Sequence, residues 1–256
     1  MKNLLKFNKL TEQSKSQTEI ISKKYKNDIE EIINIFNLQF EYFYAHLTVA
    51  CIEPYVLEYE SDKMLGIILI KNMYSFYSSI ILTQKGLVGS ARIIFRNIFE
   101  SLIIGKYAAL SKDTKFIKKW HNGGILSLKS NVFERVSKPY KDSGLAKLWE
   151  TLCKFTHSTI YSQQMMEPND KDIKYNYILI KVLLEMNYHL INSYYVNDSL
   201  RYYTQESNLY PVDESNNTPV KEERKKLKLL LKKTKSKMTK EDRKNIYDYK
   251  LKWKLK

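Results

Sequence analysis

The stretch "SARIIFRNIFESLIIGKYAAL", Ser90 to Leu110, decides the fold class. Its apolar residues recur at three- and four-residue steps, as in a helix that is buried over most of its surface. Three charged residues, Arg92, Arg96 and Glu100, interrupt it at every fourth position. At about 100° per residue these charges fall on one narrow line. Such a line predicts contact with a partner helix or a cleft rather than a broad solvated face.

The rest of the chain carries the same periodicity and few residues that break it. Glycine (7) and proline (5) are scarce among the 256 residues, which favours long helices over many short strands. No stretch shows the two-residue alternation of a strand. We therefore expect an all-α fold, a multi-helix bundle of long helices over residues 1–206. A linker is expected over 207–219 and a basic helical tail over 220–256.

Individual helices are predicted from the same pattern. The first is expected to start at Gln17, after frayed polar residues, and to end or bend at Pro54. Further helices are expected over 61–85, 90–110, 115–120, 127–136 and 145–157. The last long helix of the bundle spans 173–203, with Asp170 or Asp172 as its cap. Because apolar residues surround most of its circumference, we expect it at the centre of the bundle.

The positive charge of the chain is concentrated at its C-terminal end. The formal net charge is +15, and residues 221–256 hold 16 Lys/Arg against 5 Asp/Glu, a net +11. Residues 1–220 are therefore only mildly basic, at +4. A basic tail raises encounter rates with phosphate polymers and anionic membranes. The alternative interpretation is a solvated appendage.

Most familiar catalytic motifs are absent from the sequence. There is no Gly-rich phosphate loop, dinucleotide fingerprint, H-E-x-x-H or G-x-S-x-G. The four histidines are not paired at metal-ligand spacing, so we expect no metal and no cofactor. Cys51 and Cys153 form no C-x-x-C pair and are expected to be reduced packing residues. The apolar run Leu65 to Leu82 contains Lys71, which favours a soluble core helix over a membrane span. Because the two cysteines are expected to be reduced, we expect a cytoplasmic protein.

Two constellations could carry chemistry. Glu100 lies one helical turn from Arg96, and the two can neutralise each other. This pair is either a structural clamp that fixes helix register or an anion-binding guanidinium oriented by Glu100. The second constellation is "LCKFTHSTIY", residues 152–161, in which Lys154 and His157 share a helical side. A half-buried His157 could titrate near neutral pH, or it could simply bond to the carbonyls at the end of its own helix.

Together these residues hold the parts for metal-independent RNA cleavage. If His157 faced Arg96, the histidine would move the proton and the arginine would stabilise the pentavalent phosphate. We therefore predict Arg96, Glu100 and His157 as catalytic residues. The nearby side chains of Arg92, Lys154 and Tyr161 are predicted to bind the substrate.

The order of these motifs resembles a bacterial family of all-helical domains. It has an R-x-x-x-E helix, a tryptophan near residue 120 and a downstream "LWETLCKFTHST". These domains are similar to the HEPN (higher eukaryote and prokaryote nucleotide-binding) superfamily and to abortive-infection proteins. The resemblance covers roughly residues 60–200 and implies a ribonuclease or RNA-binding protein in phage defence or a toxin system. HEPN ribonucleases keep Arg and His on one helix, whereas Arg96 and His157 are far apart here.

Three functions follow as hypotheses. The leading one is an HEPN-like protein that binds or cleaves RNA. The basic tail is expected to bind nucleic acid, with RNA favoured over DNA. A homodimer is a further expectation. The second is a non-enzymatic module that binds nucleic acid or protein, in which the Arg/Glu pair is structural. The third is a peripheral membrane protein that uses "KKLKLLLKK" in its tail, which we rank below the other two.

Overall fold

The bundle is all-α in the part of the chain that the structure, a computed structural model, describes. These residues are 2–51, 60–111, 114–124, 145–156 and 169–196, with the single tail positions 225, 226, 229 and 232. The helices are α1 (Lys2–Lys24), α2 (Lys26–Cys51), α3 (Glu60–Gln84), α4 (Val88–Ser111), α5 (Thr114–His121), α7 (Leu145–Thr156) and α9 (Asp170–Val196). No strand occurs among these residues, so the predicted fold class is confirmed. The helix expected over 127–136 and the linker over 207–219 lie outside the described residues.

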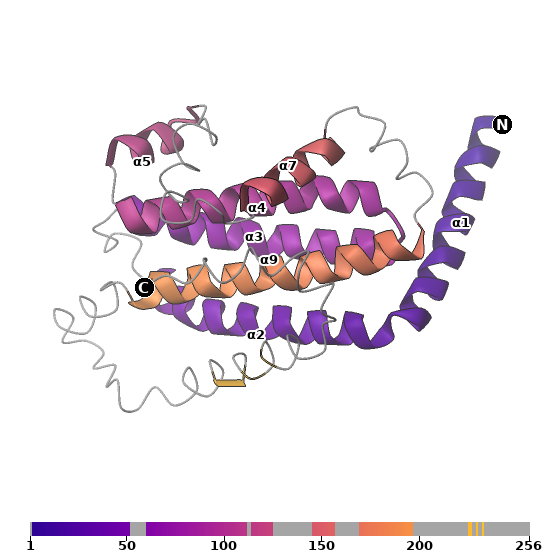
Figure 1. The fold of residues 1–256 in the computed structure, drawn as a ribbon, viewed down its shortest axis with the longest axis horizontal. Coiled ribbons are helices and arrows are strands. Elements are labelled where there is room, and N and C mark those ends of the chain that lie inside the picture. The colour runs from indigo at the N-terminus through magenta and orange to yellow at the C-terminus, as the bar shows by residue number, and fades with distance from the viewer. Residues whose placement is uncertain are drawn as a thin grey trace.

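Four long helices form the body of the bundle. Figure 1 shows α2, α3, α4 and α9 side by side with nearly parallel axes, while α7 crosses over α4. α3 and α4 form the most extensive helix pair, and α9 packs against α2, α3 and α4. The short helix α5 packs on α3. Its Phe116 ring meets Tyr107 of α4 edge to face, with the ring centroids 4.5 Å apart.

The first helix differs from the sequence prediction. It begins at Lys2 rather than at Gln17, because the polar residues before Gln17 include no proline or glycine to stop a helix. α1 then leaves the direction of α2 at Tyr25 (Figure 1). The hydroxyl of Tyr25 donates to the carbonyl oxygen of Asp170 at 3.0 Å, and its ring lies 5.3 Å from that of Tyr177. These contacts with α9 fix the place where the chain bends.

Two glycines end helices in the same way. After α3, Leu87 N–H donates to Leu82 C=O and Gly86 N–H donates to Thr83 C=O, the paired bonds of a Schellman motif. Gly86 has φ 72°. This backbone conformation is unfavourable for any residue that carries a Cβ atom, and glycine adopts it readily. Gly123 ends α5 with the same bond pattern and φ 69°. The first of these turns reverses the chain and places α4 beside α3.

The central position predicted for α9 is confirmed. Every residue from 179 to 188 is buried, because this helix packs against neighbours on several sides. Its cap differs from the prediction, since the side-chain oxygen of Asn169 accepts the backbone N–H of Asp172 at 3.1 Å. Asp170 and Asp172 lie in the first turn instead, where their charges face the positive end of the helix dipole.

One helix also satisfies the length and composition of a membrane span. Among the described residues only Met64–Gln84 does so, with a mean hydropathy of 1.4. It is α3, and 44% of this stretch is buried inside the bundle. Core helices of soluble proteins commonly pass the same test.

Candidate functional site

The charged line of α4 is divided between two neighbouring helices. Arg92 reaches α9, whereas Glu100, which holds Arg96, contacts α7. The exposed fractions differ accordingly, at 2% for the side chain of Arg92 against 24% for that of Arg96. One line in the sequence therefore becomes two sites with different surroundings.

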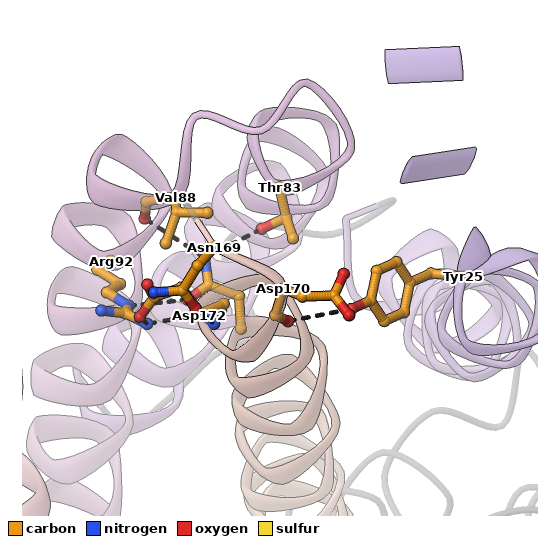
Figure 2. Close-up of polar contacts among 8 residues, drawn as sticks. Tyr25, Thr83, Val88, Arg92, Asn169, Asp170 and Asp172 are labelled. Atoms are coloured by element: carbon orange, nitrogen blue, oxygen red, sulfur yellow. Dashed lines mark hydrogen bonds and ion pairs between the residues drawn. The ribbon is translucent and has the colours of Figure 1, made fainter. Parts of the chain in front are cut away.

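Arg92 joins α4 to the first turns of α9 (Figure 2). Its guanidinium lies 3.0 Å from a carboxylate oxygen of Asp172 and donates to the side-chain oxygen of Asn176 at 2.9 Å. The amide of Asn176 donates in turn to Val88 C=O and to the hydroxyl of Thr83, at 3.3 and 3.5 Å. The start of α4, the end of α3 and the start of α9 are thus tied at one end of the bundle.

The electrostatics of Arg92 are those of a buried ion pair. Burial lowers the pKa of its guanidinium, and the hydrogen bond and charge of Asp172 oppose that effect. The guanidinium carbon also lies 5.2 Å from the ring centroid of Tyr175, within cation–π distance. In this conformation Arg92 offers almost no surface to a ligand. Its surroundings favour the structural interpretation of the charged line, while its predicted role in binding substrate stays a prediction.

Arg96 and Glu100 form the pair that their spacing predicts. Arg96 Nε donates to Glu100 Oε1 at 2.7 Å, and Trp149 Nε1 of α7 approaches the same oxygen at 3.3 Å. The carboxylate therefore holds the arginine and at the same time joins α4 to α7. About a quarter of the Arg96 side chain is exposed, so this ion pair lies near the surface of the protein.

The remaining predicted site residues belong to α7 or follow it in the sequence. Lys154 is exposed on the last turn of α7. His157 directly follows the last residue of this helix, and it lies outside the described residues, as does Tyr161. Lys154 is thus the basic residue of α7 whose side chain the structure describes. Whether His157 reaches Arg96 stays a prediction.

A buried polar network lies apart from the predicted site. The side chain of Gln39 donates to Leu184 C=O at 2.6 Å and accepts from Asn187 at 3.0 Å. Asn72 donates to Asn187 at 3.3 Å and accepts from the hydroxyl of Ser101. One chain of hydrogen bonds therefore joins α2, α9, α3 and α4. Polar residues inside apolar helical runs are the sequence signal for it, but their partners cannot be assigned without the fold.

Two buried lysines were also missed by the sequence analysis. Lys181 of α9 lies 2.7 Å from Asp28 and 2.9 Å from Glu31, and so forms an ion-pair cluster with α2. Lys106 of α4 is 1% exposed, and burial lowers the pKa of its ammonium to about 8. Both lie in apolar runs, so the periodicity alone did not separate them from surface lysines.

No group of three or more His, Cys, Asp and Glu residues suited to a metal ion occurs among the described residues. Cys153 of α7 is a half-buried thiol. Comparison of the chain with protein-family models, with curated proteins and with solved structures found no match. The candidate site therefore rests on the residues and contacts given above, and its centre is the Arg96–Glu100 pair where α4 meets α7.

Proposed function

We propose that the protein binds RNA, with the surface where α4 meets α7 contacting its phosphates, and that it cleaves RNA as an HEPN-like, metal-independent endoribonuclease of phage defence or a toxin system. The single observation that carries the binding proposal is the orientation of Arg96. Its Nε is held at 2.7 Å by Glu100 and about a quarter of its side chain is exposed, so little side-chain entropy is lost when the guanidinium contacts an anion.

The charges nearby agree with an anionic ligand. Lys154 is exposed on the helix that contacts Glu100 through Trp149. In the tail, Lys225, Lys226 and Lys232 are exposed and helical. Exposed basic side chains, together with a strongly basic segment of the chain, are typical of proteins that hold a phosphate backbone without reading its sequence.

The chemical step that we propose uses the ribose 2′-hydroxyl as the nucleophile. His157 removes the proton of that hydroxyl, the 2′-oxygen attacks phosphorus, and the bond from phosphorus to the 5′-oxygen breaks. Water gives a proton to the leaving 5′-oxygen and His157 releases its proton to solvent, so the products are a 2′,3′-cyclic phosphate and a 5′-hydroxyl. Arg96 stabilises the extra negative charge on the phosphorane oxygens.

RNA binding is tested by fluorescence anisotropy with a labelled single-stranded RNA over a series of salt concentrations. The Arg96→Gln variant is expected to weaken binding and to reduce the salt slope by about one unit, because one phosphate contact is lost. Lys118→Gln is the matched control, since it removes an exposed positive charge from α5. Equal effects of the two substitutions would mean that Arg96 acts only through the net charge.

Cleavage is tested with total RNA in the presence of a metal chelator. The wild type is expected to give fragments with cyclic phosphate ends, and His157→Ala is expected to give none. Cleavage by both proteins, or by neither, would remove the catalytic part of the proposal. Circular dichroism of His157→Ala shows whether the variant is folded.

A second candidate function is binding through the tail alone. The described tail residues favour it, because Leu229 is 58% exposed among exposed lysines. In this case neutralising Lys225, Lys226 and Lys232 to Gln weakens RNA binding and lowers its salt slope, while Arg96→Gln has no effect. If the ligand is instead a membrane, the wild type sediments with anionic but not with neutral vesicles.

A further inference from the structure

The outer face of α3 carries an exposed apolar seam. It consists of Ile67, Ile70, Tyr74 and Tyr77, whose exposed fractions are 48%, 38%, 73% and 59%. The opposite side of the same helix is buried against α4 and α9. Single exposed apolar residues are ordinary, but four of them aligned on one helix form a continuous surface of the kind that marks an interaction site.

The spacing of the seam is that of a coiled coil. Its residues follow one another at steps of three, four and three, and Ile81, which is half-buried, continues the series after four more. These are the a and d positions of a heptad repeat. The seam is narrow, because exposed Lys71 and Ser78 flank it on one side and the positions on its other side, such as Met73, are buried. A strict a/d stripe fits a partner helix, whereas a membrane surface requires a wider apolar face.

We propose that this seam is a homodimer interface, in which α3 of one copy packs against α3 of a second copy. In a dimer with a two-fold axis, the same surface patch of each subunit contacts its copy on the other subunit. One apolar seam per chain is therefore sufficient to form the contact. The four side chains expose on the order of 400 Å² per copy. With the flanking residues, a dimer would bury about 1,000 Å² in total, which reaches the lower limit of a specific interface.

The basic tail of the same chain fits this seam poorly. On the exposed face of α3, the charged residue among the described positions 64–84 is Lys71, which is positive. The tail is also positive, with a net charge of +11. Covering the seam with the tail would bring like charges together. A second copy brings one lysine for each subunit, and each lysine lies at the solvated edge of the contact.

The test uses the full chain, freed of nucleic acid at high salt, in sedimentation velocity from about 1 to 100 μM, because interfaces at the low end of the size range are commonly weak. The wild type is expected to shift from monomer to dimer over this range. Tyr74→Glu and Tyr74→Lys are each expected to remain monomeric, because two like charges then meet in the seam. An equimolar mixture of the two variants is expected to form dimers again, because opposite charges then meet.

Ile20→Glu is the matched control, since it places the same charge at an exposed apolar position of α1, 64% exposed, away from the seam. It is expected to dimerise like the wild type. A wild type that is monomeric at the highest concentration overturns the proposal. So do dimers that persist in both Tyr74 variants, or a mixture that stays monomeric. The readout is subunit mass, so it is independent of RNA binding.

Discussion

Substitution of Arg92 by methionine is expected to destabilise the protein far more than the same change at Arg96. Methionine keeps much of the apolar stem of arginine and removes the charge, so the variant isolates the polar contacts. In the wild type the guanidinium bonds Asp172 at 3.0 Å and Asn176 at 2.9 Å, with 2% of its side chain exposed. The Arg92→Met variant leaves the Asp172 carboxylate without this ion pair.

The size of the effect follows from this burial. Removing one partner of a buried ion pair costs about 3–5 kcal/mol. The Asp172 side chain is 20% exposed, so water can solvate part of its charge and the lower end applies, about 3 kcal/mol. Asn176 retains its bonds to Val88 and Thr83, so the loss of its bond to Arg92 adds at most about 1 kcal/mol. For a chain of this size the total corresponds to a Tm lower by roughly 10 °C.

Urea unfolding followed by circular dichroism measures this free energy. Arg96→Met is the control, and because its ion pair is an i,i+4 pair near the surface its cost is expected to be about 1 kcal/mol or less. A double-mutant cycle of Arg92→Met with Asp172→Asn is expected to give a coupling energy of about 2 kcal/mol. Coupling below about 0.5 kcal/mol, or equal costs at the two arginines, would refute the assignment of Arg92 as a buried clamp.

Two further predictions concern α3 and α4. Burial lowers the pKa of Lys106 from 10.5 to about 8, so between these pH values the unfolded chain keeps a proton that the folded chain has released. The free energy of unfolding should therefore rise by up to about 1.4 kcal/mol per pH unit in this range. Urea unfolding at about pH 8 and pH 10 measures this rise, which the Lys106→Met variant should lose. A rise that is the same in the variant and the wild type contradicts the argument. A Cβ at Gly105 would lie 2.8 Å from Leu190, so Gly105→Ala is expected to destabilise the bundle by about 1–2 kcal/mol. Gly66→Ala, with nothing within 4 Å, is the control and should stabilise α3 by about 0.5–1 kcal/mol; equal thermal shifts would exclude close α4–α9 packing as the cause.

The sequence predicted the positions of helices where apolar residues recur periodically. The prediction failed for bends and caps, which depend on contacts with residues far away in the chain. The apolar circumference of α9 correctly placed that helix at the centre of the bundle. The bend at Tyr25 was missed, because it is fixed by contacts with Asp170 and Tyr177, which are more than 140 positions away. The cap of α9 was placed one or three residues too late, since Asn169, Asp170 and Asp172 are all residue types that favour helix starts.

The candidate site was predictable only within one helix. The Arg96–Glu100 ion pair follows from four-residue spacing and is present at 2.7 Å. The contact of Glu100 with Trp149 joins positions 49 apart, and periodicity holds no information on such a pair. The amide network of Gln39, Asn72 and Asn187 was missed for the same reason.

By itself the sequence determined that the chain is helical, which surfaces of α4 and α9 are apolar, and where charge lies along α4, because these depend on residues three or four positions apart. Only the tertiary structure decided that Arg92 is buried against Asp172 and that Arg96 stays partly exposed beside α7. The physical reason is that the cost of burying a charge depends on the partner that each neighbouring helix supplies. In one charged line, packing thus separated a structural ion pair from the arginine that we propose to contact RNA.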